Sequence, residues 1–135
     1  MMYEDKLRGK IIYADRRKQL IDFSKLRYDN ITPTDIDGYI EKQNRMFIFF
    51  EFKYGDVEMP KGQKTAFTRL VDVLEKAGKD AVLMSCRHDV KDTSLEIDGA
   101  EAIVKEYYYK GQWYKSINRT VKDVTDSFMK YINKE

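Results

Sequence analysis

The sequence predicts an α/β protein in which helices cover both faces of a β-sheet. The segment from Met46 to Phe52 is apolar at nearly every position, as expected for a strand in the middle of a sheet that is buried on both sides. A second buried strand is expected from Ala81 to Cys86, and an amphipathic helix from about Gly62 to Ala77 lies between the two. Such strands require helices above and below the sheet.

Length and composition indicate a single domain, residues 1–135. A chain of 135 residues can bury a core without disulfides or a structural metal. Charged residues make up 36% of the chain, but 25 Lys and Arg are balanced by 23 Asp and Glu, for a net charge of +2. Net charge alone therefore does not mark a nucleic-acid binder, because that property depends on how charges cluster.

The sequence predicts a soluble cytoplasmic protein without membrane contact. The only cysteine, Cys86, excludes an internal disulfide and fits a reducing compartment. The N-terminus lacks the apolar core of a signal peptide, and the longest purely apolar run, Met46 to Phe50, is far shorter than a membrane span.

A surface helix and a β-hairpin are expected in the first half of the chain. The charged segment from about Glu4 to Leu20 carries a narrow apolar stripe, which is typical of a helix lying on a surface. Two strands, Asp35 to Ile40 and Met46 to Lys53, follow and are joined by a turn around Asn44.

The helix from Gly62 to Ala77 is expected to pack one face on the sheet and to end at Gly78. Its predicted inward residues, which recur at helical spacing, are Gln63, Ala66, Phe67, Leu70, Val71 and Leu74.

The C-terminal part is expected to contain a hairpin and a helix. Ser94 to Ile97 has the pattern of a weak strand, and Ile103 to Tyr109 is expected to pair with Gln112 to Lys115 across the turn Lys110-Gly111. Thr120 is expected to cap a final helix. The residues that this helix is expected to bury are Val121, Val124, Phe128 and Ile132.

Acidic side chains and a lysine fall on the two strands of the first hairpin. Because side chains alternate between faces, Asp35 and Asp37 share one face, and Glu51 and Lys53 share one face. In a hairpin centred on Asn44, Asp37 stands opposite Glu51, and Asp35 stands opposite Lys53. A register shifted by one residue would place the acids on opposite faces.

Directly opposed carboxylates have Cβ atoms about 5 Å apart, close enough to share one divalent cation. A hard cation such as Mg²⁺ relieves their repulsion and also accepts phosphate oxygens. Lys53 offers a positive charge to a scissile phosphate, or helps to position and deprotonate an attacking water. Gln63 is the polar residue in the inward stripe of the helix, so its amide needs a polar partner such as water or phosphate.

Each of these features also has a structural explanation. Glu-x-Lys on a strand is commonly a solvated ion pair. Lys61, Lys64 and Arg69 suit a phosphate backbone, but a solvated helix face explains them as well. Base stacking and cross-strand packing both account for the aromatic group of the second hairpin, namely Tyr107, Tyr108, Tyr109, Trp113 and Tyr114.

The motifs Thr34-Asp35-Ile36-Asp37-Gly38, Glu51-Phe52-Lys53 and Gly62-Gln63 together resemble those of the PD-(D/E)xK nuclease superfamily, in particular its small phage and prophage members. The resemblance covers about Ile31 to Leu74 and extends weakly to the second hairpin. It implies a restriction endonuclease-like core of α-β-β-β-α-β order, a central mixed sheet flanked by helices, followed here by a hairpin and a helix. It also implies Mg²⁺-dependent hydrolysis of DNA phosphodiester bonds, with Mn²⁺ as a substitute.

By this resemblance Asp37 and Glu51 hold the metal, Lys53 assists the attack of water, and Gln63 is the glutamine of the following helix. The chain departs from the family pattern at Thr34-Asp35, where Pro-Asp is expected, so Asp35 remains an alternative metal ligand. Relatives that add an acid from the first helix point to Glu4 or Asp15, and nothing in the sequence selects one.

The sequence thus favours a metal-dependent nuclease that acts on DNA. One alternative is a catalytically inactive nuclease-like module that binds nucleic acid or a protein partner. A structural domain whose charges form ion pairs is another. Small nucleases that cut both strands often form homodimers, and the sequence leaves a homodimer as one alternative for this protein.

Overall fold

The computed structural model describes residues 9–10, 13, 15, 18–19 and 21–133. The chain divides into two compact units, Met1–Pro33 and Thr34–Glu135. The expected helix from Glu4 to Leu20 falls largely on residues outside the described ones. The second unit contains, in order, β1 (Gly38–Lys42), β2 (Met46–Tyr54), α3 (Lys61–Lys76), β3 (Asp80–His88), the 3₁₀ turn η1 (Gly99–Glu101), β4 (Ile103–Tyr109), β5 (Gln112–Lys115) and α4 (Val121–Asn133).

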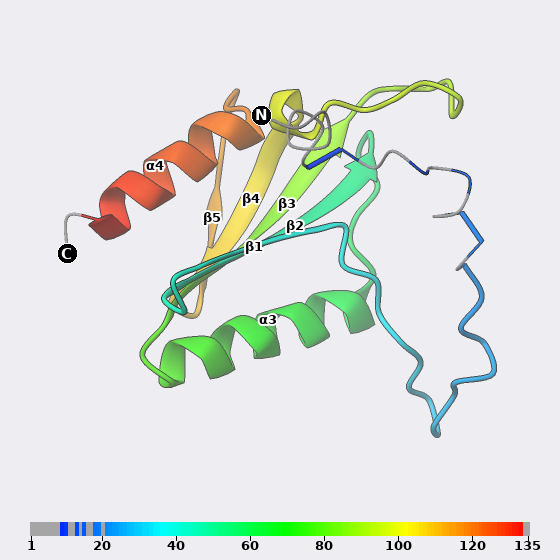
Figure 1. Ribbon diagram of the computed structural model, residues 1–135, viewed down its shortest axis with the longest axis horizontal. Coiled ribbons are helices and arrows are strands. Elements are labelled where there is room, and N and C mark those ends of the chain that lie inside the picture. Colours follow the sequence, from blue (N-terminus) through cyan, green and yellow to red (C-terminus); the bar gives the residue numbers. More distant parts are fainter. Residues whose placement is uncertain (1–8, 11–12, 14, 16–17, 20, 134–135) are drawn as a thin grey trace. The chain divides into compact units, whose positions relative to one another are not determined.

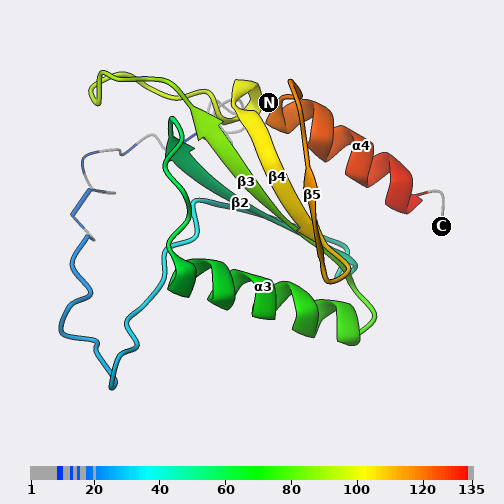
Figure 2. The same cartoon turned by 180° about the vertical axis from the view of Figure 1, so that it is seen from behind.

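One five-stranded sheet, in the order β1-β2-β3-β4-β5, forms the centre of the second unit. The strands β2 and β3 are parallel and are connected through α3, whereas the other neighbouring pairs are antiparallel. Helix α3 covers one face of the sheet and α4 covers the other (Figures 1 and 2). The predicted α/β class and the mixed sheet flanked by helices are therefore confirmed. In the described part of the chain two strands precede α3, where the core implied by the resemblance has three.

Strand β2 is buried on both faces, as its continuous apolar sequence predicted. Phe49 packs toward α3, and its neighbours Ile48 and Phe50 pack toward α4. The other members of the buried hydrophobic cluster on the α3 side are Met59, Phe67, Val71, Ala81, Leu83 and Tyr108. Those on the α4 side include Val82, Met84, Cys86, Ala102, Val104, Val121 and Val124.

The first hairpin has the predicted register, because every pair from Gly38–Phe50 to Lys42–Met46 is equidistant from Asn44. The strand boundaries differ from those expected. Gln43 and Asn44 turn the chain with φ angles of 53° and 55°, so β1 continues to Lys42 instead of ending at Ile40.

Helix α3 is rotated relative to the predicted stripe. Phe67 and Val71 are fully buried, while Ala66 and Leu70, which were expected to face inward, are exposed. The buried face is centred between Phe67 and Val71, and this rotation carries Lys64 toward the sheet.

The second hairpin and the final helix match their predicted boundaries closely. Rings pair across the hairpin, with Tyr107 stacked on Tyr114 and Tyr108 tilted against Trp113. The helix cap is confirmed, because the backbone N–H of Asp123 donates a hydrogen bond of 3.1 Å to Thr120 Oγ1.

The expected weak strand from Ser94 to Ile97 is wrong. Asp92 Oδ1 accepts hydrogen bonds from the backbone N–H of Ser94 at 3.0 Å and from its hydroxyl at 2.7 Å. Such local side-chain bonds favour a turn over a strand, and the segment lies exposed.

No helix in the described part of the chain is both long and apolar enough to cross a lipid bilayer.

Candidate active site

Asp37 lies directly before β1, at the end of the hairpin. Its Oδ2 accepts a hydrogen bond of 2.8 Å from the backbone N–H of Phe52. Continuing the observed register by one residue places Asp37 opposite Glu51. The backbone thus brings the two predicted carboxylates to one side of the hairpin, and the side chain of Asp37 is fixed on β2.

Asp35 does not take the position that the sequence predicted for it. The ladder ends at Gly38, and Asp35 is exposed, with no ion pair to Lys53 in the described structure. The backbone N–H of Phe52 donates to the side chain of Asp37. In a longer β1, this N–H would instead donate to a backbone carbonyl of β1, so the side-chain bond explains why the strand pairing stops. Of the two aspartates, Asp37 is the one held beside Glu51.

Glu51 is a buried acid with only one of its two oxygens paired. Its side chain is 3% exposed, and Oε1 lies 3.2 Å from the Nζ of Lys53. Its Oε2 is buried and has no hydrogen-bond partner among the described residues. A buried carboxylate oxygen without a partner is costly, so this atom is suited to accept a cation, a proton or a hydrogen bond from water.

The surroundings of Glu51 favour its neutral form. Burial raises the pKa of Glu51 from its ordinary value of 4.5 to about 7, and the negative charge of Asp37 acts in the same direction. The ammonium group of Lys53 opposes this rise. Without a further positive charge, a carboxyl group with this pKa is about half protonated at neutral pH.

Gln63 faces the sheet from the start of α3, as predicted. Its side chain is partly buried, and Oε1 is a buried oxygen without a hydrogen-bond partner in the described part of the chain. Gln63 and Glu51 therefore each leave an oxygen unpaired in the layer between the sheet and α3.

The donors in this layer are suited to a hard cation. Asp37 and Glu51 provide carboxylates and Gln63 an amide oxygen, with neither thiolate nor imidazole among them, which fits Mg²⁺ or Mn²⁺ better than Zn²⁺. No group of three or more His, Cys, Asp or Glu among the described residues is arranged to hold a metal. Glu4 lies outside the described residues, and Asp15 belongs to the first unit.

The predicted basic residues of α3 differ in their surroundings. Lys61 and Arg69 are exposed. Lys64 is partly buried, with Nζ 3.4 Å from Glu106 Oε1 and 4.4 Å from the centre of the Trp113 ring. Lys64 is therefore held by contacts within the protein.

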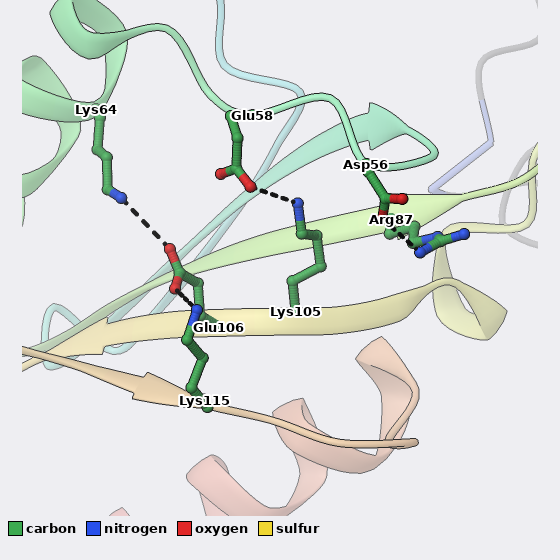
Figure 3. Close-up of polar contacts among 7 residues, drawn as sticks. All are labelled: Asp56, Glu58, Lys64, Arg87, Lys105, Glu106 and Lys115. Carbon is green, nitrogen blue, oxygen red and sulfur yellow. Dashed lines mark hydrogen bonds and ion pairs between the residues drawn. The ribbon is translucent and has the colours of Figure 1, made fainter.

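Sequence reasoning missed a polar row that crosses the sheet beside Glu51. Glu51 pairs with Ser85 on β3, Ser85 with Glu106 on β4, and Glu106 with Lys115 on β5. Glu106 accepts contacts from both Lys64 and Lys115 (Figure 3). The charges in the Tyr-rich strand were a signal, but their alignment depends on strand order, which the sequence does not reveal.

Comparison of the chain with family models, curated proteins and solved structures found no match.

Proposed function

We propose that this protein is a metal-dependent nuclease that hydrolyses DNA phosphodiester bonds, built on a restriction endonuclease-like core. The observation that carries the proposal is the buried carboxyl group of Glu51, which is held between Asp37 and Lys53 and has one oxygen unpaired. Perturbed carboxyl groups of this kind concentrate at functional sites.

Asp37 and Glu51 are the proposed metal ligands. The hydrogen bond from Phe52 fixes one of the two carboxylates, and burial fixes the other, so the pair is preorganised. A divalent cation bound there would act as a Lewis acid toward a phosphate oxygen. Its positive charge would also stabilise the ionised form of Glu51.

Lys53 and Gln63 are proposed to act on the substrate. The Nζ of Lys53 is held at the site by Glu51, where it supplies positive charge to the scissile phosphate. The amide of Gln63 orients the attacking water or a phosphate oxygen through its unpaired Oε1 or its N–H groups. In the hydrolysis, the water oxygen forms the new bond to phosphorus, the bond to the leaving oxygen breaks, and the water proton ends on the leaving group or solvent.

A second candidate function is a nuclease-like module that binds nucleic acid or a protein partner without cutting. The ion pair between Lys53 and Glu51 favours it, because the lysine already has a partner inside the protein. In that case the pair only maintains the fold.

Cleavage assays separate the two functions. Linear, supercoiled, branched and single-stranded DNA, with RNA for comparison, would be incubated with wild type, Glu51→Gln and Lys53→Ala in Mg²⁺, Mn²⁺ or EDTA. Lys122→Ala is the matched control, because Lys122 forms an exposed ion pair with Asp126 on α4, which covers the other face of the sheet.

If the protein is a nuclease, wild type and Lys122→Ala should cut DNA in Mg²⁺ or Mn²⁺ and should stop cutting in EDTA. The cleavage rates of Glu51→Gln and Lys53→Ala should be lower by at least about 100-fold. Equal cutting by all four proteins would indicate a contaminant and refute the proposal. Binding of DNA without any cutting would support the second candidate.

A further inference from the structure

A β-bulge in β4 brings a further cationic side chain to the face of the sheet that carries Glu51. Ser85 pairs with Glu106, but the next residue of β3, Cys86, pairs with Val104, so Lys105 is an extra residue on β4. Bulges of this kind re-aim side chains and are common next to active sites.

The consequence of the bulge is that two consecutive residues point to the same side. Val104 and Tyr107 pack on the α4 side of the sheet. Lys105 and Glu106 both contact groups on the α3 side, since Lys105 Nζ lies 3.3 Å from Glu58 Oε1 and Glu106 binds Lys64 of α3 (Figure 3). Regular alternation would have sent one of the two into the opposite layer.

Arg87 stands between this lysine and the candidate active site. It is paired with Lys53 in the parallel ladder of β2 and β3. Lys53, Arg87 and Lys105 therefore occupy three adjacent strands, over a width of about 10 Å given the usual strand spacing.

Carboxylates of the loop between β2 and α3 cover two of these cations. Asp56 Oδ1 lies 2.7 Å from Arg87 Nη1, and Glu58 lies over Lys105 (Figure 3). Asp89 also binds Arg87, at 3.1 Å. The loop acids are far more exposed than the cations, at 86% for Asp56 and 75% for Glu58 against 37% for Arg87 and 22% for Lys105.

We propose that Arg87 and Lys105 bind phosphate groups of the nucleic-acid backbone beside the cleavage site, and that Asp56 and Glu58 occupy these cations until nucleic acid displaces them. The proposal rests on the proposed function for the identity of the ligand. Exposed carboxylate–cation pairs are weak, so little is lost when they open. A phosphodiester offers the same cations charged oxygen acceptors, and Arg is well suited to bind them in pairs. The loop acids therefore act as a built-in competitor that disfavours other anions.

Binding of a labelled DNA duplex to proteins in a Glu51→Gln background, which prevents cutting, tests this inference. Fluorescence anisotropy would be recorded over a range of salt concentrations. Arg87→Gln and Lys105→Gln are expected to weaken binding and each to lower the slope of log K against log salt by about 1. Glu58→Gln is expected to tighten binding by about 1.5- to 5-fold, the range that corresponds to an exposed ion pair.

Two controls separate the loop contact from a general effect of net charge. Asp126→Asn removes an exposed acid of similar character from the α4 side, and it should leave the affinity nearly unchanged. Glu58→Gln should lose its effect when combined with Lys105→Gln, because its partner is then absent. Thermal denaturation of each variant verifies that the protein is folded.

The inference is overturned if Arg87→Gln and Lys105→Gln leave affinity and salt slope unchanged, or if Glu58→Gln tightens binding equally with and without Lys105. Cleavage by wild type is a separate result. If wild type cuts DNA and these variants behave like their parent, the inference fails while the nuclease function stands. If the variants behave as expected and no protein cuts, the phosphate site belongs to a binding module.

Discussion

The carboxyl group of Glu51 is expected to make the stability of the metal-free protein fall as the pH rises through the neutral range. Its pKa is raised from 4.5 to about 7 in the folded protein, chiefly by burial. Between these two pH values the unfolded chain has released the Glu51 proton and the folded protein still holds it. The folded state then binds more protons than the unfolded state, so the free energy of unfolding decreases with increasing pH.

The magnitude follows from the size of the shift. Each pKa unit corresponds to about 1.4 kcal/mol, so a rise from 4.5 to about 7 costs on the order of 3 kcal/mol once Glu51 is ionised in both states. The cost is absent below pH 4.5 and complete above pH 7. Asp22, Asp92 and Glu106 have lowered pKa values, so their stabilising contributions are lost only as the pH falls below the ordinary range of carboxyl groups.

Urea unfolding in EDTA between pH 5 and pH 8 measures this effect. The free energy of unfolding of wild type is expected to fall by on the order of 3 kcal/mol from pH 5 to pH 8. That of Glu51→Gln, which resembles the protonated side chain, should change little, so this variant should be the more stable protein at pH 8. Mg²⁺ at 100 times its Kd should raise the free energy of unfolding of wild type by about 2.7 kcal/mol and should leave that of Glu51→Gln unchanged. Glu101→Gln, at an exposed glutamate, should keep the wild-type pH dependence. A flat profile for wild type, or the same slope in Glu51→Gln, would show that the Glu51 carboxyl group does not hold its proton in the folded protein.

Three further substitutions test the site and the fold by urea unfolding in EDTA. Lys53→Ala should lower the free energy of unfolding by about 1–3 kcal/mol at pH 8, because it removes the cation that is paired with Glu51, and by clearly less at pH 5. Equal losses at both pH values would contradict this. Tyr108→Phe should cost about 1 kcal/mol, because its hydroxyl donates a 2.7 Å hydrogen bond to Asp72; no change would mean the bond adds nothing. Thr120→Ala should also cost about 1 kcal/mol by uncapping α4, whereas Thr120→Ser should be close to wild type.

Features that depend on local sequence were predictable. The first hairpin was placed correctly in register because Asn44 accepts a positive φ, and the second because Lys110-Gly111 does. The inward orientation of Gln63 and the proximity of Asp37 to Glu51 follow from these local elements once helix period and strand alternation are applied.

Features that depend on tertiary packing were not predictable. The rotation of α3 that exposes Leu70 and draws in Lys64 is set by contacts with the sheet and with Trp113. The bulge at Lys105 follows from the pairing of β4 with β3, and the sequence of β4 alone does not predict it. The loss of Asp35 from the ladder results from one side-chain hydrogen bond, made by Asp37 to β2.

Calorimetric titration with Mn²⁺ tests directly whether Asp37 and Glu51 together hold a divalent cation. The titration would be run at pH 6.5 in two buffers of different ionisation enthalpy, with wild type, Glu51→Gln and Asp37→Asn. We expect one saturable site in wild type, with proton release because the Glu51 carboxyl group is largely protonated at this pH, and loss of the site in both variants. Absence of binding to wild type, or the same binding in Glu51→Gln, would contradict this expectation.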